Sequence, residues 1–145
     1  MLFKQVDRTG PEQAFVVGRN TSGGALSAGV PVFWETDAVT DGNAFSAAID
    51  DTAFSLFAGL TDSAMADDDY GLVQVYGYRQ SAYASAASAG CAVGIPLIPV
   101  DGSDFLTDAT SSTAHTFNFV SLMETIAAGA ANSGTLQWNV FIRAL

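Results

Sequence analysis

The chain repeats part of its own pattern, and this repetition limits the folds that it can adopt. The segment GLVQVYG at residues 71–77 is similar to GTLQWNV at 134–140, and the spacing from residue 71 to residue 134 is 63. The segment GVPVFWETD at 29–37 is similar to GIPLIPVDG at 94–102, and the spacing from residue 29 to residue 94 is 65. A fixed period usually means that one unit needs its neighbour to bury an apolar face. We therefore predict two half-repeats, over residues 13–80 and 81–145.

The residue pattern between these landmarks is typical of an all-β protein. Short segments rich in Val, Phe, Trp and Tyr alternate with clusters of Gly, Asp, Ser and Thr. With 145 residues the chain has the size of one domain, and a chain of this length can build a full hydrophobic core. We expect a single compact β-barrel or β-sandwich over residues 1–145, with an N-terminal arm at 1–12.

The strength of the strand pattern differs along the chain. Residues 72–78 form the clearest strand, and because both of its faces are largely apolar it is either central or faces a neighbouring subunit. A weaker strand is expected at 81–89, where the alanines would also permit a helix. Prolines at positions 96 and 99 predict an edge strand at 95–100, since proline cannot donate to a ladder. Residues 44–60 leave two options open, a short helix near 47–51 or a strand at 54–60.

The charge balance excludes several classes of function. Five basic residues face fifteen acidic ones, which gives a net charge of −10 at pH 7. We therefore expect neither nucleic acid nor a membrane surface as a partner, because both carry negative charge. Only 14% of the residues are charged and 49% are hydrophobic, whereas a soluble domain has roughly 25% charged residues. This surface is therefore expected to be covered in part by a partner or by copies of itself.

The start of the chain differs from the rest in charge. Lys4, Arg8 and Arg19 lie in the first nineteen residues, so three of the five basic residues are concentrated there. Such an asymmetry is typical of an arm that docks on another surface. Aromatic residues on strands can contribute further contacts, because aromatic side chains anchor interfaces. The predicted capsid or subunit contacts are Leu2, Phe3, Lys4, Arg8, Trp34, Tyr76 and Tyr78.

The chain carries no motif of an enzyme or of a cofactor site. His115 is the single histidine and Cys91 the single cysteine, so neither a base–nucleophile pair nor a zinc site with a second cysteine can be read from the sequence. We expect Cys91 to pack as a small apolar residue. The run Asp67, Asp68 and Asp69 lacks the alternating spacing of a calcium loop, so a solvated loop cap is favoured over a cation site. No catalytic, cofactor or metal residue is predicted.

Three stretches carry a resemblance to a known family. They are NTSGGALSAGVPV at residues 20–32, the segment 57–77 around ADDDYGLVQVYG, and AGCAVGIPL at 89–97. In these patterns the chain resembles the capsid decoration (cement) proteins of tailed bacteriophages. The resemblance implies a small β-protein without catalytic activity, made in the host cytoplasm and located on the exterior of the virion. It also implies the major capsid protein as partner, bridging of capsid subunits to stabilise the shell, and self-association as a trimer or dimer.

Two other functions remain open at this stage. One is a different virion β-domain, associated with a tail or a fibre. The other is a carbohydrate-binding, adhesin-like module, in which the tyrosines would stack on sugars.

Overall fold

The all-β prediction is confirmed by the computed structural model. The structure describes residues 12–36, 42–47, 54–85, 90–100, 103–109, 119–127 and 136–144. Within this part of the chain, the helical content is a single 3₁₀ turn, η1 (Phe54–Leu56). The strands are β1 (Gln13–Asn20), β2 (Pro31–Trp34), β3 (Ala44–Ser46), β4 (Phe57–Thr61), β5 (Tyr70–Ser85), β6 (Pro96–Pro99), β7 (Leu106–Asp108), β8 (Val120–Leu122) and β9 (Leu136–Arg143).

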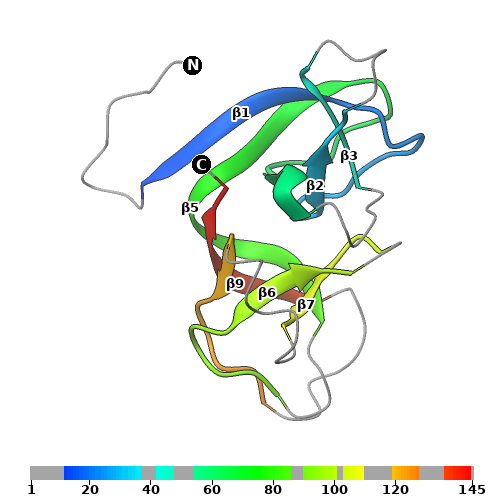
Figure 1. Cartoon of the computed structure of the whole chain (residues 1–145). Helices are drawn as coiled ribbons and strands as arrows, with labels where there is room; N and C mark the ends of the chain where they lie inside the picture. Colours follow the sequence, from blue (N-terminus) through cyan, green and yellow to red (C-terminus); the bar gives the residue numbers. More distant parts are fainter. Residues whose placement is uncertain are drawn as a thin grey trace.

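The nine strands form one mixed sheet that closes on itself twice. The strand order is β1-β3-β2-β4-β5-β7-β6-β8-β9, and β5 pairs in addition with both β1 and β9. The first closed ring therefore contains β1, β3, β2, β4 and the N-terminal half of β5, and the second contains the C-terminal half of β5 with β7, β6, β8 and β9. Figure 1 shows β5 running from the lobe that holds β1, β2 and β3 into the lobe that holds β6, β7 and β9.

The two rings have the same connectivity. In the first ring β1 is parallel to β3, β3 is antiparallel to β2, β2 to β4, and β4 to β5. In the second ring β5 is parallel to β7, β7 is antiparallel to β6, β6 to β8, and β8 to β9. The two sequence landmarks fall on equivalent strands, β2 with β6 and the first half of β5 with β9. Strand β5 itself spans the boundary between the predicted half-repeats.

Each ring encloses its own hydrophobic core. The first core includes Val32, Phe45 and Val73, and the second includes Leu97, Leu106 and Val140. The wall between the two cores is built from β2 and β4, which are apolar on both faces because each face lies against a core. The first core receives Val32 and Ala58 from this wall, whereas the second receives Phe33, Phe57 and Leu60.

The crossing point of β5 lies at Gly77. This residue is paired with Gln13 of β1 on one side and with Ile142 of β9 on the other. Its φ of +104° lies in a region that other residues rarely adopt, and an added Cβ would collide with the carbonyl oxygen of Glu12. Glycine is therefore required here, because β5 must turn from one ring into the next while keeping a neighbour on each edge.

Two predictions about individual strands need a correction. Strand is confirmed at 72–78 and at 81–85, but the two are not separate strands, since β5 runs without interruption from Tyr70 to Ser85. Strand β6 is not an edge strand, because it pairs with β7 on one side and β8 on the other. Pro96 and Pro99 are tolerated because they stand at the two ends of this four-residue strand. The undecided segment 44–60 contains β3, η1 and the start of β4.

Several sequence predictions fall on parts of the chain outside the described residues. These are residues 1–11 of the arm, most of the helix option at 47–51, and His115. Cys91 is described and packs in the second core with 3% of its surface exposed, as predicted. Burial raises the pKa of its thiol, and the charge of Asp108 adds to this effect. None of the described residues forms a helix of the length and apolarity that crossing a membrane requires.

The bend at Gly77 generates a stability prediction. Gly77→Ala adds both backbone strain and a collision with Glu12, so we expect it to lower the free energy of unfolding by at least about 3 kcal/mol. The matched control is Gly23→Ala, which also has positive φ (+75°) but has open space around the added Cβ. The control should cost only about 1 kcal/mol. Equal losses in chemical denaturation would contradict the role given to Gly77.

Candidate functional site

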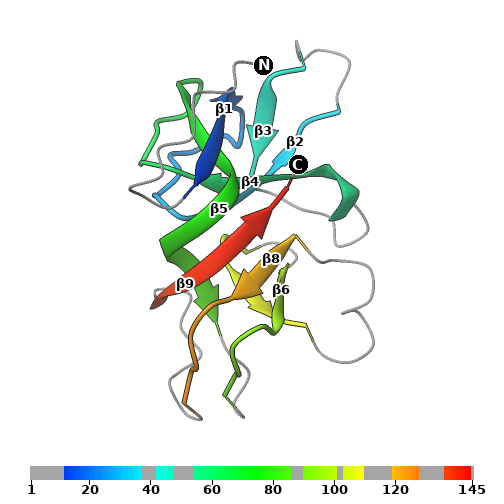
Figure 2. The same ribbon diagram turned by 90° about the vertical axis from the view of Figure 1, so that its left-hand side faces the viewer.

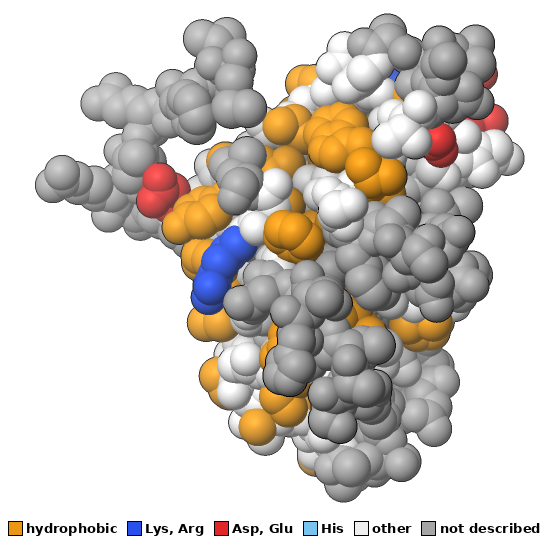
Figure 3. All heavy atoms as spheres, in the orientation of Figure 1, with side chains coloured by type: hydrophobic (Ala, Val, Ile, Leu, Met, Phe, Trp, Pro, Cys, Tyr) orange, Lys and Arg blue, Asp and Glu red, His pale blue; other side chains and the backbone are white. Residues whose placement is uncertain are grey.

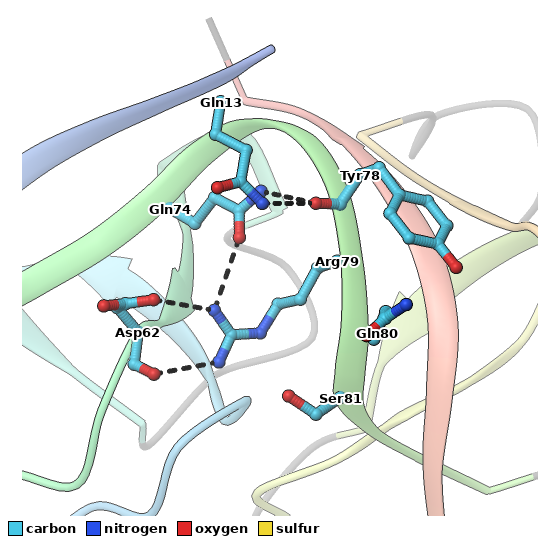
Figure 4. A pocket seen from close by; sticks show the side chains of 7 residues that line it. All are labelled: Gln13, Asp62, Gln74, Tyr78, Arg79, Gln80 and Ser81. Atoms are coloured by element: carbon cyan, nitrogen blue, oxygen red, sulfur yellow. Dashed lines mark hydrogen bonds and ion pairs between the residues drawn. The ribbon is translucent and has the colours of Figure 1, made fainter. Parts of the chain in front are cut away.

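A polar pocket lies where β5 leaves the first ring. It has a volume of about 360 Å³. Figure 4 shows the Arg79 guanidinium between the Asp62 carboxylate and the Gln74 amide, with Gln13 above them. The pocket is lined by Gln13, Asp62, Gln74, Tyr78, Arg79, Gln80 and Ser81. Five of these residues belong to β5, so the pocket is a direct result of the path of that strand.

Arg79 connects the residues that line the pocket, and its side chain is only 7% exposed. Its Nη1 donates to the Asp62 carboxylate (3.4 Å) and to the Gln74 Oε1 (3.3 Å), and its Nη2 donates to the Asp62 carbonyl (3.1 Å). The Gln74 amide in turn donates to the carbonyl oxygens of Tyr76 and Tyr78. The Arg79 Nε is buried and has no hydrogen-bond partner among the described residues. A buried guanidinium thus links β5 to the residue that follows β4.

The electrostatics of this pocket favour a structural role. Burial lowers the pKa of Arg79, and the charge of Asp62 together with its hydrogen bond opposes that shift. A guanidinium does not exchange protons near neutral pH, so the Arg79–Asp62 pair is suited to fixing two segments and not to general acid–base catalysis. Among the described residues that line the pocket, there is no other ionisable pair.

The acidic run is used as a loop cap, in line with the option that the sequence favoured. The Asp67 carboxylate accepts a hydrogen bond from the Gly23 N–H (3.0 Å), and Asp68 forms an ion pair with Arg19 (2.7 Å). The fully buried Asn20 joins the same loops, because its amide donates to the Ala66 carbonyl (3.0 Å). Among the described residues, no group of three His, Cys, Asp or Glu side chains could hold a metal ion.

An exposed apolar face covers the outside of the β1–β5 pair. Val17 lies directly opposite Leu72, and Phe15 and Tyr70 share their face through the two-residue alternation of a strand. The exposed fractions are 38% for Phe15, 59% for Val17, 61% for Tyr70 and 41% for Leu72. We call these four residues the β1–β5 apolar face. Among the described side chains that are visible in Figure 3, hydrophobic and uncharged ones predominate and few are charged.

The contact residues that the sequence predicts lie in different parts of the structure. Trp34 is half-buried and packs against the first core. Tyr76 and Tyr78 are half-buried on β5, where the ring of Tyr76 meets Phe141 edge to face (5.4 Å between centroids). Tyr78 lines the polar pocket. Leu2, Phe3, Lys4 and Arg8 lie outside the described residues.

Sequence reasoning missed the β1–β5 apolar face as a unit. The alternation of Leu72 with Val73 indicated two apolar faces, but nothing in the sequence placed Phe15 and Val17 beside that strand. This pairing spans more than fifty residues of chain, and only the register of β1 on β5 reveals it.

Comparisons with known proteins identify a fold neighbour. Neither the models of protein families nor the curated protein sequences give a match. Among solved structures, the chain is similar to the head fibre gp8.5 N base of bacteriophage phi29, with a TM-score of 0.55 and 14% sequence identity. The similarity covers 92% of this chain and 96% of that one. The two proteins therefore share a fold over almost their entire lengths.

The Arg79 network predicts an effect on stability. Asp62→Ala removes the carboxylate that compensates a buried guanidinium, and we expect it to lower the free energy of unfolding by about 1–2 kcal/mol. The control Asp69→Ala removes an exposed carboxylate away from the pocket and should change stability by less than about 0.5 kcal/mol. Urea denaturation measures both. A loss for Asp62→Ala no greater than that of the control would show that the pair contributes nothing.

Proposed function

We propose that this chain is a structural protein of a phage virion, located on the outside of the head and bound to the major capsid protein. The observation that supports this most directly is the fold shared with the phi29 head fibre base over 92% of the chain. A second support is the β1–β5 apolar face, which leaves four large side chains open to a partner. No catalytic step or cofactor is part of this proposal.

Physically, such a protein acts by repeated weak contacts. Each copy buries the β1–β5 apolar face against the shell, and a copy that touches two capsid subunits gains from the high effective concentration of the second contact. Arg19 and Asp68 lie at one end of this face, beside the exposed Asp67 and Asp69. This acidic end matches basic side chains on the partner, because opposite charges steer association. Clustering as a trimer or dimer would multiply these contacts.

The second candidate within the same class is the base of a head fibre. The fold neighbour favours it, since that protein is the base of a head fibre. The two candidates differ in what they do to the shell. A cementing protein bridges capsid subunits and strengthens the head, whereas a fibre base needs only to remain attached.

Reconstitution on heads tests the proposal. Purified protein mixed with heads that lack it should co-sediment with them, and failure to bind heads at any ratio would overturn the proposal. Bound protein should also raise the temperature at which heads release DNA if it bridges subunits. Binding without such a rise would favour the fibre base over the decoration protein.

The proposed contact surface can be tested separately. Leu72→Asp places a charge in the centre of the β1–β5 apolar face, and we expect at least tenfold weaker head binding, which corresponds to about 1.4 kcal/mol. Ser55→Asp adds the same charge at an exposed position of η1 and should bind like the parent. Equal binding of both variants would remove this face from the interface.

The N-terminal arm is a further element of the proposal. Deletion of residues 1–7 removes Leu2, Phe3 and Lys4, and we expect reduced occupancy on heads. Occupancy measured by quantitative gel densitometry of purified heads gives the answer. An unchanged copy number per head would exclude the arm from binding.

A further inference from the structure

The equivalence of the two rings extends to single hydrogen bonds. In the first ring the Gly29 N–H donates to the Thr61 carbonyl (2.8 Å), and in the second the Gly94 N–H donates to the Leu122 carbonyl (2.7 Å). Both glycines have a φ of +86°. Gly29 and Gly94 therefore occupy the same structural position in their rings.

The residues that follow these acceptors are equivalent too. The Asp62 N–H donates to the Leu72 carbonyl, and the Met123 N–H donates to the Asn139 carbonyl, each at 2.8 Å. Met123 thus stands in the second ring where the carboxylate of Asp62 stands in the first.

In the first ring this position is covered by an extended segment, the C-terminal half of β5. The Tyr83 N–H donates to the Gly29 carbonyl (3.0 Å). The segment passes so close that a Cβ on Gly29 would collide with the carbonyl oxygen of Ser81. At its start, Arg79 donates to Asp62 from a nearly buried position.

In the second ring no described segment covers the equivalent position. No atom of the described residues lies within 4 Å of a Cβ added to Gly94. The neighbouring Val93 is 57% exposed and Met123 is 43% exposed. Figure 2 shows the chain segments before β6 and after β8 running together at the end of the molecule remote from β3. An isolated antiparallel β-bridge between Cys91 and Ile126 pairs these two segments. In the described part of the chain, the second ring therefore presents a copy of this surface without the segment that covers it in the first ring.

We propose that this surface, formed by Val93, Gly94 and Met123, binds an extended segment of a different protein chain. The occupant of the first ring defines its chemistry. A main-chain N–H of the segment donates to the Gly94 carbonyl, as Tyr83 does to Gly29, and a small residue passes over Gly94. An apolar side chain replaces Arg79, because Met123 and Val93 offer an apolar contact in place of a carboxylate. Addition of an extended segment is a common mode of peptide recognition.

Within the described residues, a second copy of this chain offers no free strand that could serve as that segment. Every described strand already has a neighbour on each side, because both rings are closed. No described strand of another copy is therefore free to be donated. The inference depends on the internal repeat alone and does not require the proposed virion function.

Peptides based on β5 provide the test. The probe is the blocked seven-residue peptide covering residues 78–84 with Arg79→Leu, and the control is the same peptide with its native arginine. Titrated into ¹⁵N-labelled full-length protein, the leucine peptide should shift the amide signals of Gly94 and Met123. The arginine peptide should bind roughly three- to fivefold more weakly, since it finds no carboxylate.

A charge exchange makes the assignment specific. Met123→Asp restores the first-ring arrangement, so this variant should reverse the preference and bind the arginine peptide more tightly than the leucine peptide. Gly94→Ala places a methyl group in the path of the segment and should abolish both responses, whereas Gly23→Ala, with similar φ in open space, should leave them unchanged.

Three results of the peptide titrations would overturn the inference. They are no response of Gly94 and Met123 to millimolar leucine peptide, an unchanged preference in Met123→Asp, and shifts confined to another surface. Concentration-dependent shifts of these amides without any peptide would make a second copy the occupant and refute the assignment to a different chain.

Discussion

The structure depends on one strand that belongs to two closed rings. Because β5 has β1 and β4 as neighbours in its first half and β7 and β9 in its second, its hydrogen bonds close both rings. This is possible only if the strand turns sharply without losing either neighbour, and Gly77 allows that turn. The polar pocket follows from the same geometry, since the bend brings Arg79 back over Asp62 and Gln74. A single backbone constraint therefore sets the fold and its main polar site.

The two rings share their backbone geometry but differ in their side chains. Both rings keep the glycine turn before the second strand and the hydrogen bonds around it. They differ in side chains, with Asp62 against an arginine in one ring and Met123 exposed in the other. The repeat thus conserves backbone geometry, while the side chains at equivalent positions differ.

Much of the fold could be predicted from the sequence because strand signals are local. The alternation in 72–78 and the Gly-Pro landmarks at 29–31 and 94–96 marked real elements. The closure of the rings could not be predicted, since it depends on pairings such as Val17 with Leu72 that are distant in sequence. The sequence also does not show that β6 has a neighbour on each side, so Pro96 was interpreted as a sign of an edge strand. The site was predicted least well, because Arg79 carried no motif and only the bend of β5 reveals its partners.

The wall of β2 and β4 has a mechanical consequence. Its side chains Phe33, Phe57 and Leu60 reach the second core, while Val32 and Ala58 reach the first. Close-packed interiors have low compressibility and transmit strain. A force applied to one lobe therefore passes directly into the other through packed side chains and not through a flexible hinge, so the molecule should bear load as one rigid body.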